Sequence, residues 1–157
     1  MLRANKGSGN NEDRDLWQTP KILFDNLNKQ YNFTFDCCAN EENTKCELFS
    51  SNFKEWADIE LLNKICWINP PFSKSKEMFE HFFKVITKGV AIFRCDNMET
   101  KVWQDIILKN ANWIFIPKGR VNYEGFIGKS SVFGSALIGF NVKPPIGLEG
   151  IVLYLRV

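Results

Sequence analysis

The sequence is poor in metal-ligating patterns. Its 157 residues include a single histidine, His81, and five cysteines, none of which forms a Cys-x-x-Cys pair. Zinc sites are built mostly from such cysteine pairs and from histidines, so we expect no metal. The odd number of cysteines, together with the lack of a charged-then-apolar segment at the start of the chain, favours a reducing, cytoplasmic compartment.

Long apolar runs and an excess of charge of one sign are also missing. No stretch approaches the ~20 consecutive apolar residues of a membrane-spanning helix, so we expect no membrane association. The 20 Lys and Arg residues nearly balance the 18 Asp and Glu residues, for a net charge of +2. A nucleic-acid-binding protein with this balance must gather its cations on one local face, and its affinity should fall with salt.

The residues that are present fit one globular domain. The chain is 45% hydrophobic and 14% aromatic, enough for a sizeable core at this length. Residues 1–13 are polar, rich in glycine and asparagine, and without periodicity. We therefore expect a flexible N-terminal arm over 1–13 ahead of a single domain over 14–157.

Strand and helix patterns alternate along most of the chain. Thr19-Pro20 predicts the start of a helix that runs to about Gln30. Amphipathic spacing predicts further helices over about 75–87 and 99–110, and apolar runs predict strands over 33–37, 65–68, 89–94 and 112–116. The last apolar segments, 134–140 and 151–155, have no helix between them and are predicted to pair antiparallel. This order indicates an α/β fold of three αβα layers, with a mostly parallel sheet and an antiparallel C-terminal strand pair.

The motif Asn69-Pro70-Pro71-Phe72 directly follows the strand predicted over 65–68. An exocyclic amino nitrogen is a poor nucleophile because its lone pair is delocalised into the ring. Two acceptors at its N–H bonds favour a freer lone pair, and the Asn69 side-chain oxygen and a neighbouring carbonyl can supply them. The prolines stiffen the turn, and the Phe72 ring offers a surface on which an extruded base can stack. The alternative interpretation is a rigid Pro-Pro turn in which Asn69 only ends the strand.

Further polar residues are expected at the same edge of the sheet. Asp36 ends the strand predicted over 33–37, and a polar segment follows Arg94 at the end of the strand over 89–94. Ligands of open α/β sheets bind beyond the carboxyl ends of the strands. The sequence therefore predicts that Asp36, Asn69 and the segment after Arg94 converge on one site, although Asp36 alone could simply cap a turn.

With these motifs placed, the chain resembles the small phage-encoded DNA N6-adenine methyltransferases, the phage Dam family. The resemblance covers residues 15 to 141. It rests on Asp15-Leu16-Trp17-Gln18-Thr19-Pro20, Phe35-Asp36, Asn43, Cys46, Trp56, the Asn-Pro-Pro-Phe motif, Thr100, Trp103, Gly119-Arg120 and Gly134-Ser135. It implies a compact Rossmann-like fold that binds S-adenosylmethionine and transfers its methyl group to N6 of an adenine flipped out of DNA.

The resemblance also implies roles for individual residues. Cofactor binding falls to Trp17, Thr19, Pro20, Asp36 and Asn43, and catalysis to Asn69, Pro70, Pro71 and Phe72. The chain has no room for a separate target-recognition domain, so loops must contact the DNA. The nearest basic candidates are Lys74, Lys76, Lys118, Arg120 and Lys129. An origin in a phage or prophage follows, with protection of the modified DNA against host restriction.

One departure from the usual pattern keeps alternatives open. Most methyltransferases follow the first strand with a glycine-rich turn, whereas here Asp36 is followed by Cys37-Cys38-Ala39-Asn40. A catalytically silent, DNA-binding methyltransferase fold is therefore one alternative. Methylation of cytosine N4 is another, because its amino group has the same geometry. Methylation of cytosine C5 is not expected, because no cysteine follows a proline in a strand-end loop. The oligomeric state is not indicated.

Overall fold

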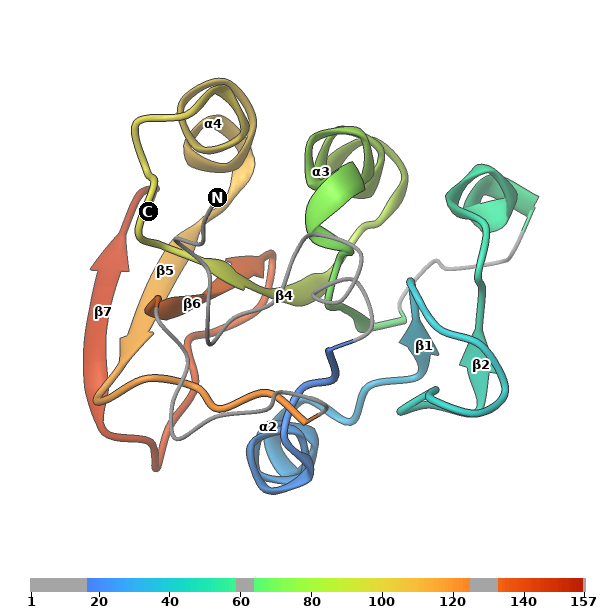
Figure 1. The fold of residues 1–157 in the computed structure, drawn as a ribbon, viewed down its shortest axis with the longest axis horizontal. Helices are drawn as coiled ribbons and strands as arrows, with labels where there is room; N and C mark the ends of the chain where they lie inside the picture. Colours follow the sequence, from blue (N-terminus) through green and yellow to red (C-terminus); the bar gives the residue numbers. More distant parts are fainter. Residues whose placement is uncertain (1–16, 59–63, 125–132, 157) are drawn as a thin grey trace, which may run out of the picture.

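A computed structural model describes residues 17–58, 64–124 and 133–156, which form a mixed α/β fold around one sheet (Figure 1). The predicted arm over 1–13 and the predicted DNA contact Lys129 lie outside these residues. Within the described residues, no helix is long and apolar enough to cross a membrane.

The sheet has seven strands in the order β2-β1-β3-β4-β6-β5-β7. Their bounds are β1 Phe35–Asp36, β2 Leu48–Phe49, β3 Cys66–Ile68, β4 Gly89–Arg94, β5 Trp113–Pro117, β6 Ser135–Phe140 and β7 Gly150–Tyr154. Strands β2, β1, β3 and β4 pair parallel. Strand β6 pairs antiparallel with both β4 and β5, and β7 pairs antiparallel with β5. Strands β1 to β5 therefore share one direction, and their carboxyl ends share one edge of the sheet.

The prediction that the last two strands pair with each other is wrong. Both run against the other five strands, but β5 lies between them. Their side chains give the reason. Strand β6 is buried on both faces over Ser135–Gly139, whereas four of the five β7 residues are exposed. A strand apolar on both faces is most stable inside a sheet, and the more exposed strand takes the edge.

Helices lie on both faces of the sheet (Figure 1). Helix α2, Lys21–Tyr31, covers one face. The 3-10 helix η1, Phe53–Asp58, helix α3, Ser75–Val85, and a π-helical turn, η3 Val102–Ile107, cover the other. The short 3-10 turn η2, Phe72–Lys74, leads into α3, and α4, Leu108–Asn110, continues η3. Helix α2 begins one residue later than predicted: Pro20, not Thr19, is its N-cap, and the Thr19 side chain makes no capping bond.

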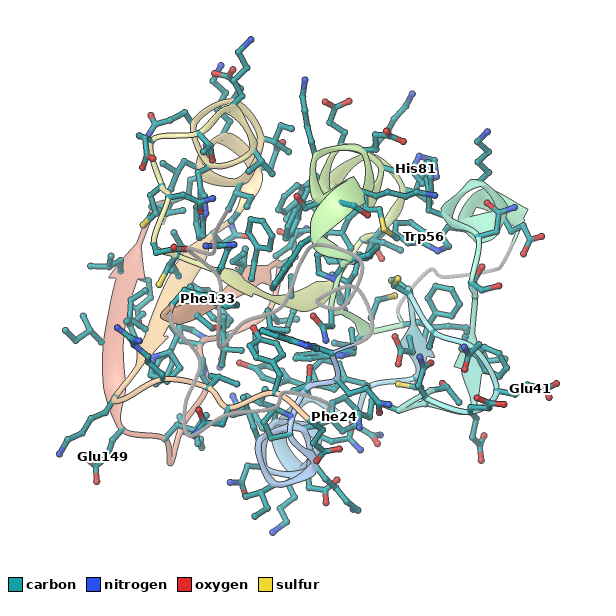
Figure 2. All side chains as sticks on the ribbon, viewed as in Figure 1. Phe24, Glu41, Trp56, His81, Phe133 and Glu149 are labelled. Carbon is teal, nitrogen blue, oxygen red and sulfur yellow. The ribbon has the colours of Figure 1, made fainter. Side chains whose placement is uncertain are left out.

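Alternate strand residues divide the core into two halves, as the pleat requires. In β4, Ala91 and Phe93 join the half beneath α3, while Val90 and Ile92 join the half beneath α2. Trp56 and Phe24 lie in opposite halves (Figure 2). Because the central strands are buried on both faces, they appear in the sequence as continuous apolar runs.

Strands β5 and β6 pack closely at Gly139. This glycine pairs with Trp113, and a Cβ at position 139 would lie 1.9 Å from the Trp113 ring. We expect Gly139→Ala to lower the free energy of unfolding by about 3 kcal/mol, because overpacking displaces a buried ring. Urea denaturation measures the change. Gly134→Ala is the matched control, since its Cβ would meet only Cys95 Sγ at 3.3 Å. Equal stability of the two variants would contradict the described register.

Candidate active site at the carboxyl edge of the sheet

A cavity of about 230 Å³ lies beyond the ends of β1 and β3. The register of these strands explains its position, because Asp36 pairs with Trp67 and Asn69 follows two residues later. Six of the nine predicted cofactor-binding and catalytic residues line the cavity: Trp17, Thr19, Asp36, Asn43, Asn69 and Pro71. The other three, Pro20, Pro70 and Phe72, do not line it.

Among the described residues that line this cavity, Asp36 carries the only acidic side chain, and it is 3% exposed. Its Oδ2 accepts a hydrogen bond of 2.9 Å from the Lys45 backbone N–H, and its Oδ1 accepts one of 3.3 Å from that of Cys38. Burial nevertheless raises the pKa of the carboxyl from 3.8 to about 6, against the opposing effect of these two bonds and of the Lys45 charge. A buried carboxylate of this kind is stabilised by a cationic ligand.

Asparagines close the loop after β1, where a glycine turn was missing from the sequence. The Asn40 side-chain oxygen accepts bonds from the backbone N–H groups of Glu42 and Asn43, and the Asn43 side-chain oxygen accepts one from Asn40 N–H. The Ala39 N–H donates to the Ser50 carbonyl, which ties the loop to the chain after β2. The loop is therefore ordered without a glycine, and it leaves the cavity open beside Asp36.

The Thr19 hydroxyl is buried beside the cavity and has an unused capacity for hydrogen bonding. The residue is 1% exposed and lines the cavity, and within the described part of the chain its buried Oγ1 has no hydrogen-bond partner. Buried hydroxyls almost always have a partner, because an unsatisfied one loses its bonds to water. A polar group of a bound molecule in the cavity can supply that partner.

Asn69 is oriented by the segment that precedes α2. Its Nδ2 donates a hydrogen bond of 3.2 Å to the Trp17 carbonyl. The chain there is held by a bridge between Gln18 and Glu124, whose backbone groups exchange bonds of 2.9 and 2.8 Å. With Nδ2 engaged, the amide presents Oδ1 as its acceptor to a ligand.

A second cavity of about 480 Å³ adjoins the first and shares Cys38, Ser51 and Pro71 with it. It runs between η1 and the start of α3, where Asn52, Phe53 and Met78 line it. Cofactor sites usually occupy 300 to 1,000 Å³. The first cavity alone falls below that range, whereas the two together lie within it.

Phe72 belongs to an aromatic cluster, and it lines neither of these cavities. Its ring meets those of Trp17, Phe93 and Phe133 edge to face, with centroids 6.2, 6.2 and 5.5 Å apart. Trp17 belongs to both places, since it also lines the first cavity. The cluster therefore lies next to the cavity, with Trp17 in common.

The described basic candidates do not form one patch at the cavity. Lys74 lines the second cavity, and Lys76 is exposed near the start of α3. Lys118 pairs with Glu149 at 3.3 Å, on the opposite side of the molecule from Glu41 in the loop after β1 (Figure 2). Arg120 is exposed beyond the end of β5. Of the described candidates, Lys74 and Lys76 follow the motif most closely in the chain.

Sequence reasoning missed several residues that line the site. Lys45, Asn40 and Ser51 line the first cavity, and Ser51 and Asn52 line the second. Two of them could have been found only by recognising strand β2. Ser51 and Asn52 follow its carboxyl end, but a strand of two residues, one exposed and one half-buried, has no apolar pattern to reveal it. Among the described residues, no group of His, Cys, Asp and Glu side chains is placed to hold a metal ion.

The family model described as DNA N-6-adenine-methyltransferase (Dam) matches residues 6–135. The chain belongs to this family of enzymes. Among similar proteins is a DNA N-6-adenine-methyltransferase of Haemophilus phage HP1, 28% identical over 126 residues, which cover 75% of this chain and 71% of that protein. Another is a DNA N-6-adenine-methyltransferase of Escherichia phage T1, 38% identical over 80 residues. That match covers 43% of this chain and 32% of the T1 protein. The family resemblance drawn from the motifs is thereby confirmed.

Proposed function

We propose that this protein transfers the methyl group of S-adenosylmethionine to N6 of adenine in DNA. The observation that carries the proposal is the cavity that joins the Asp36 carboxylate and the Thr19 hydroxyl to the Asn69 amide. The names of the family and of the two relatives support adenine N6 as the acceptor. We propose a Rossmann-like fold and a single domain over 14–157 as part of the same interpretation.

The residues present fit S-adenosylmethionine. Its cationic amine suits the buried Asp36 carboxylate, and a polar group of its methionine end can supply the partner that the Thr19 Oγ1 lacks. The second cavity, with the Phe53 ring and the Asn52 side chain, suits an adenosine group. When bound, this cofactor supplies an electrophilic methyl group on a sulfonium.

The protein's contribution to catalysis is to orient and activate the acceptor. Asn69 Oδ1 and the Pro70 carbonyl would accept the two N–H bonds of the adenine amino group and free its lone pair for attack. Pro70 and Pro71 donate no hydrogen bonds and hold the turn in its extended form. Alignment of the amine with the methyl group supplies much of the rate.

The target base must leave the duplex to reach Asn69, at a cost of a few kcal/mol. Lys74 and Lys76 are the described cations best placed to neutralise phosphates beside the motif. Lys118, Arg120 and Lys129 remain candidates for contacts farther along the DNA. We propose that the enzyme acts in the cytoplasm of a bacterial host on phage or prophage DNA, and protects it from restriction.

The test is to incubate the protein with unmethylated DNA and methyl-labelled S-adenosylmethionine, digest the DNA and identify the labelled nucleoside. We expect label in N6-methyl-2′-deoxyadenosine. Label in N4-methyl-2′-deoxycytidine would replace adenine with cytosine as the acceptor. A rise in melting temperature with cofactor but no label in DNA would favour a silent DNA-binding module, because ligand binding stabilises the native state whether or not transfer follows.

Phe72 gives a separate prediction about base stacking. We expect Phe72→Ala to lose about 5 to 150 times more turnover than Phe72→Tyr, because a stacked base contributes about 1–3 kcal/mol and tyrosine keeps the ring. Turnover at saturating DNA and cofactor measures the difference. Both variants must show the wild-type shift in melting temperature with cofactor, since Phe72 also packs against Trp17. Equal losses would argue against stacking on Phe72.

A further inference from the structure

The carboxyl end of β4 brings Arg94 against the aromatic cluster that contains Phe72. The Arg94 Cζ lies 4.5 Å from the centroid of the Phe133 ring and 5.7 Å from that of Phe72. Both distances are within the range at which a guanidinium is attracted to a ring face. A planar cation therefore covers aromatic surface beside Asn69, where the proposed function requires a base to stack.

Two further interactions hold Arg94 in this place. Its Nε and Nη2 donate to the two carboxylate oxygens of Asp96, each at 2.7 Å. The Trp103 indole N–H donates to the Arg94 carbonyl at 3.0 Å and ties the end of β4 to η3. The arginine side chain is 19% exposed. A bidentate pair of this kind fixes the plane of the guanidinium as well as its position.

We propose that the Arg94 guanidinium is a placeholder for the target base, covering Phe72 and Phe133 in the DNA-free enzyme until the extruded base displaces it. The inference rests on the proposed function and adds to it a competition between the guanidinium and the extruded base for the same aromatic surface. A nucleobase and a guanidinium both stack flat on aromatic rings, so one can take the place of the other.

The competition has a measurable consequence for base extrusion. Every extruded base must displace Arg94, so removing the arginine should raise the fraction of bound duplexes with the target base outside the stack. Weakening its anchor through Asp96→Asn should act in the same direction and less strongly. An arginine that instead binds phosphate would leave this fraction unchanged, because its loss would weaken the affinity for DNA as a whole.

The experiment uses a duplex with 2-aminopurine at the position that the wild-type enzyme methylates, located by mapping the label. Fluorescence of this base rises when it leaves the stack, and saturating protein with S-adenosylhomocysteine makes it a signal per complex. We expect Arg94→Ala to raise it about threefold over wild type, and Asp96→Asn to raise it less. Lys101→Ala is the control, because it removes one positive charge from an exposed residue nearby. Unchanged or lower fluorescence in Arg94→Ala would overturn the inference.

Two checks keep the outcome unambiguous. Each variant must show the wild-type rise in melting temperature with cofactor, as a sign that it is folded. If Arg94→Ala does not, Arg94→Lys decides, since an ammonium cannot cover both rings or bridge both Asp96 oxygens. We expect it to raise the fluorescence too, and no rise would overturn the inference. Failure of the proposed function would appear differently, as an absence of label in DNA treated with the wild-type enzyme.

Discussion

Replacing Asn69 by alanine is expected to lower the rate of methyl transfer to DNA by about two to three orders of magnitude, as when one preorganised polar group is removed from an active site. The Asn69 Nδ2 is engaged by the Trp17 carbonyl, so its Oδ1 is already oriented before the substrate binds. Alanine removes this acceptor and leaves the Pro70 carbonyl alone to activate the amino group. The loss should therefore appear in kcat at saturating DNA and cofactor.

Cofactor binding separates this chemical loss from misfolding. Asp36 and Thr19 remain in the Asn69→Ala variant, so the melting-temperature rise with S-adenosylmethionine should change little. Asn26→Ala, at an exposed position of α2, is the matched control and should keep full activity. Label that persists in DNA treated with Asn69→Ala would remove Asn69 from its proposed role.

Asp36→Asn is expected to weaken cofactor binding by about 10- to 100-fold, since a hydrogen bond to a charged group contributes about 1.5–3 kcal/mol. The affinity for the cofactor should also depend on pH, because Asp36 titrates in the free protein. Burial raises the pKa of the Asp36 carboxyl to about 6, and only the ionised form can pair with a cationic amine. Between pH 7 and pH 5 the affinity of the wild-type protein should therefore fall about tenfold, whereas that of Asp36→Asn should change little. Isothermal titration measures both.

Stability of the free protein should respond to pH in the opposite direction. The folded pKa of Asp36, about 6, lies above its ordinary value of 3.8, so the folded state binds the proton more tightly than the unfolded chain. The resulting contribution, up to about 3 kcal/mol, is fully present below pH 4 and is lost as pH rises through 6. Comparing unfolding of wild type and Asp36→Asn at pH 5 and pH 7 isolates it. A stability that falls on acidification would contradict the raised pKa of Asp36. A cofactor affinity that stays constant between pH 7 and pH 5 would contradict its assignment to the cofactor amine.

The local sequence patterns predicted most of the helices and strands. The strand expected over 89–94 is β4 with the same bounds, and the amphipathic segment over 75–87 contains α3. The helix expected over 99–110 is present as η3 and α4, with a π-helical turn that its apolar spacing did not reveal. These agreements have one cause. Side-chain periodicity records which faces of an element are buried, whatever lies against them.

The site was predictable to the extent that it depends on strand ends. Asp36 and Asn69 converge because β1 and β3 are parallel neighbours, and a sequence that alternates strands and helices already implies parallel neighbours. Thr19 was expected at the site but also as a helix cap, and only the structure shows its hydroxyl buried without a described partner. Lys45 lines the cavity because the loop after β1 folds back onto Asp36, a contact for which no sequence spacing gave a signal.

By itself, the sequence determined the family, the order of the elements and the motif that ends β3, because each is written in neighbouring residues. Tertiary structure decided that β6 is inserted between β4 and β5, that two cavities meet at Pro71, and that Arg94 lies over Phe72. These features depend on which strands and side chains, distant in the sequence, pack against each other in place of other possible neighbours. Such a competition is settled by the burial of whole faces and the pairing of charges, neither of which a local pattern contains.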